Sequence, residues 1–86
     1  SIPVVLPEAV ARRMEKEIAG YFKNSVAGAV QVEVHPLVAD ILTGRGGKSL
    51  AKLEQDYGKK IVVKPSECIK HEDIKIKEID INSLVC

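Results

Sequence analysis

The sequence predicts an α+β domain, a two-layer sandwich in which helices cover one face of a three-stranded sheet, with the element order αβααββ. Three segments repeat apolar residues at helical spacing, and three others alternate apolar and polar residues as strands do. Each alternating segment is apolar on one face only, which is the pattern of a sheet that packs against a single layer of helices.

Length and composition limit the possible classes of protein. A chain of 86 residues with a net charge of +1 corresponds to a single domain over residues 1–86, in which residues 82–86 form a tail. No apolar run approaches the ~20 residues that span a bilayer, and no signal peptide opens the chain. We therefore expect a cytoplasmic protein without a membrane span.

The cysteines and histidines indicate no catalytic or metal site. Cys68 and Cys86 lack the spacing of metal ligands, and a reduced pair is expected in the cytoplasm. His35 and His71 are isolated, without a nucleophile or carboxylate partner in a recognisable motif. His35 precedes Pro36 at the junction of a strand and a helix, where capping or packing is its ordinary role. We predict no active site and no cofactor in this chain.

The first helix is predicted to begin at Pro7 and to end before Asn24. Proline is a favoured first helical residue, and Glu8 follows in the first turn, where the helix dipole favours acidic side chains. Gly20 costs roughly 1 kcal/mol relative to alanine and is expected to allow close packing on the sheet. The charged face has mixed sign and is expected to be solvated. The apolar stripe consists of Val10, Met14, Ile18 and Phe22, widened by Ala11 and Tyr21.

The middle of the chain contains a strand and two short helices. Residues 30–34 alternate valine with glutamine and glutamate, which predicts a half-buried strand. Pro36 begins a helix that runs into a glycine-rich turn, and a second helix follows as far as Tyr57. Gly58 then stops that helix, because glycine is favoured just beyond a helix end.

The last third of the chain predicts two strands. Residues 59–64 alternate until Pro65 ends the strand, and residues 66–73 form a polar connection. The third strand begins at residue 74, but its isoleucine alternation slips by one residue, which indicates a bulge near Lys77 and Glu78 or the end of the pairing. The sheet face away from the helices is expected to meet solvent or a partner, and it carries Gln31, Glu33, Lys60, Lys64, Lys75 and Lys77.

The glycine-rich turn between the two short helices is the main candidate for a binding site. Without a Cβ, glycine lets a phosphate approach the peptide plane, and the first N–H groups of the next helix favour anions. Residues 43–64 contain six cations and two carboxylates, a net charge of +4. In the alternative interpretation, Gly44 caps one helix and the other glycines only turn the chain. The predicted RNA-binding residues are Gly44, Arg45, Gly46, Gly47, Lys48, Lys52 and Lys60.

The turn resembles the G-x-x-G loop of KH domains, which grips about four nucleotides of a single strand. Leu50, Leu53, Gly58 and Ile61 fall where that family has its helix core, helix stop and next strand. The resemblance implies a KH-like fold and single-stranded RNA as a partner. The predicted element order differs from both known KH arrangements, but moving the final helix of the eukaryotic arrangement to the front reproduces it.

A second resemblance covers nearly the whole chain. The segment VLPEAVARR at 5–13 is similar to the segment just after the zinc-binding link in ribonuclease E/G-type proteins. The segments VEVHPLVA at 32–39 and LEQDYGKKI at 53–61 are similar to the C-terminal small domain of that family. This resemblance implies a fragment of a bacterial endoribonuclease, a hydrolase that cleaves single-stranded RNA in rRNA maturation and mRNA decay. In that family the small domain chiefly supports subunit association, so a homo-oligomer is implied.

The ribonuclease resemblance also implies which parts of the parent enzyme this chain lacks. The carboxylates that bind Mg²⁺, the S1-type RNA-binding domain and the cysteines of the zinc link lie upstream in the family, so no metal ligand is carried over to this chain. Many family members lack a glycine-rich turn at this point, and the turn at 44–47 is therefore a departure from the family pattern.

Three functions remain open at this point. The first is a non-catalytic RNA-contacting and assembly domain of an endoribonuclease. The second is a protein-interaction or dimerisation module without RNA affinity, in which the turn is only a connector. The third is a stand-alone KH-type RNA-binding protein. Because the chain begins with Ser1 and not with methionine, we expect an excised domain.

Overall fold

A computed structural model describes residues 7–44, 48–80 and 82 of the chain. The predicted order αβααββ and the α+β class are confirmed. The elements are α1 (Pro7–Lys23), β1 (Ala29–Val34), α2 (Pro36–Thr43), α3 (Lys48–Tyr57), β2 (Lys60–Pro65) and β3 (Ile74–Ile79).

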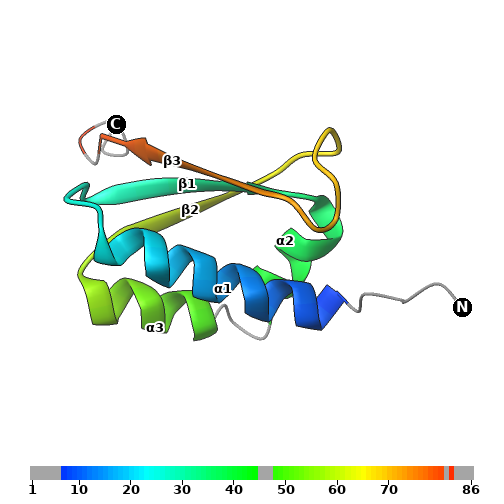
Figure 1. The fold of residues 1–86 in the computed structure, drawn as a ribbon, viewed down its shortest axis with the longest axis horizontal. Helices are drawn as coiled ribbons and strands as arrows, with labels where there is room; N and C mark the ends of the chain where they lie inside the picture. The colour runs from blue at the N-terminus through cyan, green and yellow to red at the C-terminus, as the bar shows by residue number, and fades with distance from the viewer. Residues whose placement is uncertain (1–6, 45–47, 81, 83–86) are drawn as a thin grey trace, which may run out of the picture.

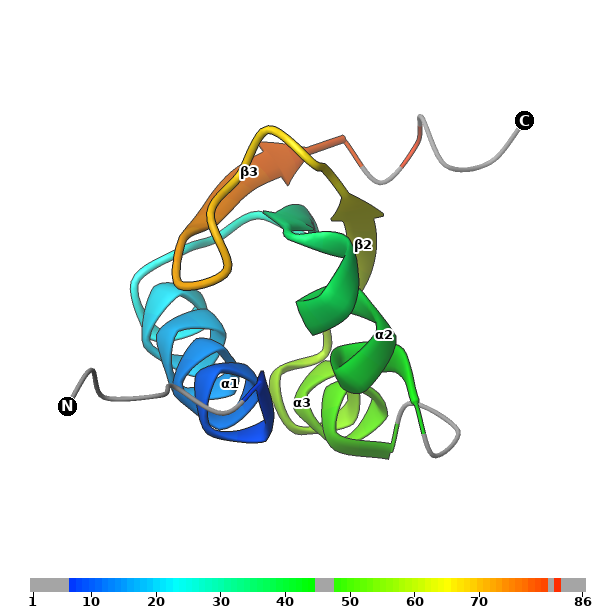
Figure 2. The ribbon, with the colours of Figure 1, turned by 90° about the vertical axis from the view of Figure 1, so that its right-hand side faces the viewer.

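The sheet has the strand order β2-β1-β3, so β1 lies in the middle. β1 runs parallel to β2 and antiparallel to β3. Because parallel neighbours cannot be joined by a tight hairpin, the chain needs a crossover between β1 and β2, and α2 and α3 supply it. Figures 1 and 2 show α1, α2 and α3 on one side of the sheet, which confirms the predicted two-layer arrangement.

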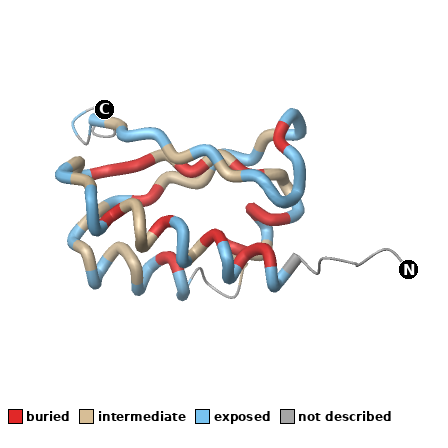
Figure 3. The backbone as a smooth tube through the Cα atoms, viewed as in Figure 1, coloured by how far each residue is buried: buried red, intermediate tan, exposed pale blue. Residues whose placement is uncertain are grey.

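The hydrophobic core lies between the two layers, where buried stretches of helix and strand face each other (Figure 3). The predicted α1 stripe is buried, with Met14 and Ile18 at 0% exposure. From the sheet, every second residue of β1 points into the same core, as the alternation predicts. The main residues of this cluster are Val10, Met14, Ile18, Phe22, Val30, Val32, Val34, Val38 and Leu42.

The three aromatic residues also belong to this core. Phe22 is buried, and its ring centroid lies 5.6 Å from that of Tyr57 in a tilted arrangement. Tyr21 and Tyr57 are half-buried and pack against the core cluster. The described face of the sheet opposite the helices therefore carries no aromatic side chain for stacking on bases.

The start of α2 and the end of α3 are determined by nearby residues in the chain. The His35 Nδ1 atom accepts a hydrogen bond of 3.2 Å from the Leu37 N–H, which caps α2 and is one of the two roles expected of this residue, and Pro36 occupies the first helical position. Gly58 follows α3 with φ of 65°, a left-handed conformation that glycine adopts without a steric penalty. No helix within the described ranges is long and apolar enough to cross a membrane.

Three details differ from the sequence-based expectations. β2 begins at Lys60, because the Lys59 N–H donates to the Glu54 carbonyl at 3.1 Å, at the end of α3. Pro65 is the last residue of β2 rather than the residue that follows it. A Cβ built on Gly20 would meet no atom within 4 Å, so the expected close packing of that glycine on the sheet is wrong.

The predicted bulge in β3 is also wrong, whereas its alternative, the end of the pairing, matches the end of β3 at Ile79. Pairing with β1 keeps a regular register from Ile74, opposite Val34, to Ile79, opposite Ala29. The alternation slips because Glu78 occupies a core-side position, where its carboxylate interacts with the side chain of Tyr21.

Candidate nucleic-acid interface

The glycine-rich turn joins two helices, as the sequence predicts. Gly44 directly follows α2, and Lys48 is the first residue of α3 (Figure 1). Arg45, Gly46 and Gly47, three of the seven predicted RNA-binding residues, lie outside the described residues. The described part of the candidate site therefore consists of the two helix ends and of what packs beside them.

Gly44 has a structural reason to be glycine. Its backbone is extended, with φ of −69° and ψ of 170°, and its N–H donates to the Ile41 carbonyl at 3.3 Å. A Cβ at this position would lie 2.8 Å from the Asp40 carbonyl oxygen, a distance that real Cβ atoms essentially never show. Gly44 thus caps α2, which is the structural role that the alternative interpretation gives it. Glycine is needed because the chain passes close to the Asp40 carbonyl oxygen, and not because φ is positive.

Lys48 and Ser49 form the exposed start of α3. The first N–H groups of a helix lack partners within the helix and carry partial positive charge, so they attract anions. Within residues 7–44, 48–80 and 82, Lys48 has no ion-pair partner. Its ammonium group therefore adds an uncompensated cation to this helix end.

A groove of about 530 Å³ lies beside the turn, between α1, the end of α2 and the start of α3. Arg12 and Lys48 supply its cations, but Glu8, Glu15 and Asp40 line it as well. The chain segment around the turn does not reveal these carboxylates, because two come from α1 and one from the polar side of α2. The groove is thus less basic than the net charge of residues 43–64 predicts.

Lys52 lies one turn further along α3, in a second groove of about 400 Å³ between α1 and α3. Arg12 and Lys16 of α1 line this groove too, and the signal that could have found them is the charged face of the first predicted helix. The Lys52 Nζ lies 4.0 Å from a carboxylate oxygen of Asp56, and both side chains are mostly exposed. Such an exposed pair contributes little stability and leaves Lys52 accessible to a ligand.

Lys60 lies apart from the predicted RNA-binding residues Lys48 and Lys52. It begins β2, beyond the C-terminal end of α3, whereas Lys48 begins that ten-residue helix. Its ammonium group lies 3.8 Å from the Glu54 carboxylate, which also accepts a hydrogen bond of 2.8 Å from the Ile61 N–H. Lys60 therefore belongs to the sheet, and only Lys48 and Lys52 accompany the turn among the predicted cations that the structure describes.

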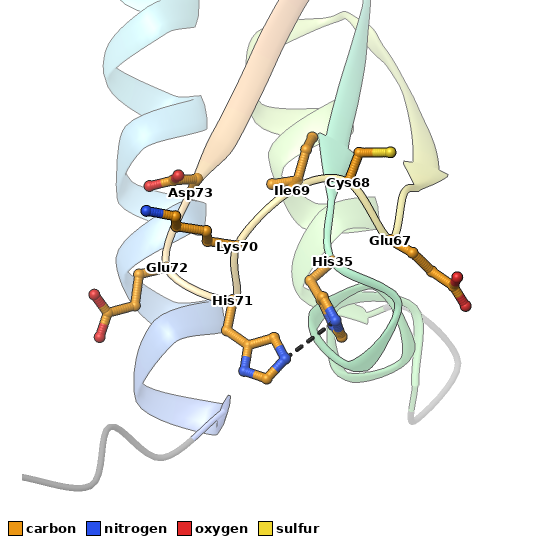
Figure 4. A pocket seen from close by; sticks show the side chains of 8 residues that line it. All are labelled: His35, Glu67, Cys68, Ile69, Lys70, His71, Glu72 and Asp73. Atoms are coloured by element: carbon orange, nitrogen blue, oxygen red, sulfur yellow. Dashed lines mark hydrogen bonds between the residues drawn. The ribbon is translucent and has the colours of Figure 1, made fainter.

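A group of imidazole, thiol and carboxylate side chains lies elsewhere, where the connection between β2 and β3 meets the start of α2 (Figure 4). The Nε2 atoms of His35 and His71 lie 3.1 Å apart, within hydrogen-bonding distance. The side chains of Cys68 and Glu72 point away from the two rings. Cys68 is an exposed free thiol, and Cys86 lies outside the described residues.

This histidine pair is not arranged to share a metal ion. Because His35 Nδ1 accepts the Leu37 N–H, the proton of the neutral ring resides on Nε2, the atom that a shared metal ion would need. In the described part of the chain, no three histidine, cysteine or acidic side chains are grouped closely enough to hold a metal ion.

Comparison with known proteins adds no identification to this geometry. No protein-family model matches the chain, and a search of curated proteins finds no significant match.

Proposed function

We propose that this chain is the non-catalytic RNA-contacting and subunit-assembly domain of a ribonuclease E/G-type endoribonuclease, which acts in rRNA processing and mRNA decay in the bacterial cytoplasm. The sequence resemblance at 5–13, 32–39 and 53–61 supports the parent enzyme. One structural observation carries the RNA contact: α2 ends just before the glycine-rich segment, α3 begins directly after it, and Lys48 and Ser49 are exposed at the start of α3. The chemistry of RNA cleavage, including Mg²⁺, belongs to upstream parts of that enzyme.

In this proposal, the RNA contact is made mainly to phosphates. The phosphate oxygens accept hydrogen bonds from the first N–H groups of α3, and Arg45, Lys48 and Lys52 supply positive charge. Base stacking contributes little, because the aromatic side chains pack in the core. The carboxylates of the adjacent groove oppose a polyanion. We therefore expect weak binding by the domain alone, with Kd above about 1 µM at physiological salt.

The proposal is tested with labelled single-stranded RNA in a fluorescence anisotropy titration. Lys48→Glu and the double variant Arg45→Asp/Gly46→Asp are expected to weaken binding and its salt dependence. Lys23→Glu is the matched control, because Lys23 is also exposed but lies at the opposite end of α1 from the groove. Equal RNA affinities for the wild type, Lys48→Glu and the Arg45→Asp/Gly46→Asp variant would contradict the proposed RNA contact.

The assembly part of the proposal is supported by the edges of the sheet. β2 and β3 each have one neighbour, so both edges present backbone groups without a sheet partner among the described residues. Pro65 removes one donor from β2, whereas β3 contains no proline and is the better strand for pairing with a second copy. Light scattering across a concentration series tests this, and a domain that stays monomeric at every concentration would contradict it.

A further inference from the structure

The sheet face away from the helices carries two rows of lysine residues. Lys60 and Lys64 stand on β2, and Lys75 and Lys77 stand on β3. The register places these residues on the same face as Gln31 and Glu33 of β1, opposite the face that packs on the core. We call these two rows the lysine rails and the polar residues of β1 between them the floor.

The spacing of the rails suits an extended chain of phosphates. Adjacent strands lie about 4.8 Å apart, so the rails stand about 10 Å apart across β1. Lys75 and Lys77 are alternate residues and stand about 6.6 Å apart along β3, whereas Lys60 and Lys64 are four residues apart and stand about 13 Å apart along β2. Since a lysine ammonium group sits on a flexible four-carbon stem, both rails can reach an anionic strand lying along β1.

The charge on this face is segregated from the rest of the molecule. Four lysines and one glutamate give the face a net charge of +3, whereas the whole chain carries +1. All four lysines are exposed. Lys60 pairs with Glu54, but Lys64, Lys75 and Lys77 have no ion-pair partner within the part of the chain that the structure describes. The field of three unpaired cations thus points into solvent.

Lysines on edge strands also prevent edge-to-edge aggregation, so that role must be weighed. Charge of either sign would serve this purpose, yet every charged residue of β2 and β3 on this face is a cation. The one carboxylate of β3, on Glu78, lies on the opposite face at Tyr21. A uniform sign on two separate strands favours attraction of an anionic partner over edge protection alone.

We propose that the lysine rails bind the backbone of a single-stranded nucleic acid that lies along β1. This surface is on the sheet layer, opposite the layer that contains α2 and α3, so it is a second contact beyond the proposed function (Figure 2). The floor offers no aromatic residue for stacking, so recognition is through phosphates and independent of base sequence. An acidic peptide would need apolar anchors, and the face supplies only the half-buried Val62 and Ile79.

The test measures anisotropy of a labelled oligouridylate across a salt series. Four phosphate contacts by the rail lysines contribute about −2.8 to the slope of log K against log salt, in addition to the contacts at the start of α3, and Lys75→Gln/Lys77→Gln is expected to reduce the magnitude of the slope by about 1.4. The control Lys23→Gln/Lys70→Gln removes the same charge at exposed sites outside the rails and should leave the slope unchanged. Equal slopes for the two double variants would overturn the proposal.

Glu33→Gln provides a test in the opposite direction, because it removes the one carboxylate from the floor. It is expected to tighten oligouridylate binding about two- to fivefold, and unchanged or weaker binding would contradict the proposal. Polyglutamate of matched charge is the competitor, and rail-dependent binding of polyglutamate at equal or higher affinity would overturn the nucleic-acid assignment. Lys48→Glu separates the two surfaces. Weaker oligouridylate binding in both Lys48→Glu and Lys75→Gln/Lys77→Gln supports both surfaces. Weaker binding in Lys48→Glu alone rejects the lysine rails, and weaker binding in Lys75→Gln/Lys77→Gln alone rejects the contact at the start of α3.

Discussion

The Nε2 atoms of His35 and His71 lie 3.1 Å apart, and this contact joins the start of α2 to the connection between β2 and β3. The two rings meet edge to face, with centroids 3.9 Å apart. His35 Nδ1 accepts a hydrogen bond from the Leu37 N–H, so the proton of the neutral His35 ring is on Nε2. This Nε2–H group donates the hydrogen bond to His71 Nε2. One arrangement of protons therefore satisfies both the helix cap and the contact between the rings.

This arrangement predicts the tautomers of both rings. Neutral His35 carries its proton on Nε2, and neutral His71 carries its proton on Nδ1. Long-range ¹⁵N–¹H correlation spectra of the imidazole rings distinguish the two forms directly. A proton on His35 Nδ1 would contradict both the cap and the direction of the hydrogen bond.

The same pair predicts an order of stabilities. His71→Ala removes the tether to α2 and is expected to lower the free energy of unfolding by about 1 kcal/mol. His35→Ala removes the tether and the N-cap together and should cost about 2 kcal/mol. Urea unfolding measures both values. An equal loss in the two variants would show that the His35 cap contributes nothing.

The hydroxyl of Tyr21 predicts a pH dependence at the alkaline end. Partial burial, followed by the charge of Glu78 and a hydrogen bond to its carboxylate, raises the pKa of Tyr21 above 10.0. A raised pKa in the folded state means that the stabilisation is complete below 10.0 and is lost as the pH rises through the folded-state value. Ultraviolet titration in a Tyr57→Phe background isolates Tyr21. Glu78→Gln should lower the midpoint towards 10.0, and an unchanged midpoint would contradict the contact.

Two glycines predict opposite responses to alanine. Gly44→Ala forces a Cβ to within 2.8 Å of the Asp40 carbonyl oxygen and is expected to destabilise the domain by about 1–3 kcal/mol. Gly20→Ala places its Cβ in open space inside α1 and should stabilise by about 0.5–1 kcal/mol. Thermal unfolding of the pair measures the difference, and a stabilising Gly44→Ala would refute the close approach at the end of α2.

The fold was predictable because its signals are local. Alternating valines mark β1, proline marks the starts of α1 and α2, and Gly58 marks the end of α3. The errors arise where contacts with other elements decide. The Lys59 N–H donates to the Glu54 carbonyl at the end of α3, so β2 begins one residue later. Glu78 follows the regular register with β1 and interacts with Tyr21 of α1, so a polar residue occupies a core-side position.

The candidate site was predictable only in part, for the same reason. Lys48 and the two helix ends lie where the glycine motif indicates. Lys60 separates from them because the length of α3 intervenes, which a count of charges along the chain does not reveal. Glu8 and Glu15 reach the groove from α1 through tertiary packing. The sequence shows which charges exist, and the packing decides which of them meet.

The central claim is that the start of α3, beside the glycine-rich turn, contacts RNA. The most direct measurement is an amide ¹H–¹⁵N NMR titration of the domain with oligouridylate at low salt. The account predicts that the amides of Gly44, Lys48 and Ser49 shift progressively and that the shifts disappear as salt is added. If these amides keep their positions at saturating oligouridylate while other resonances move, the turn does not bind RNA and the claim is wrong.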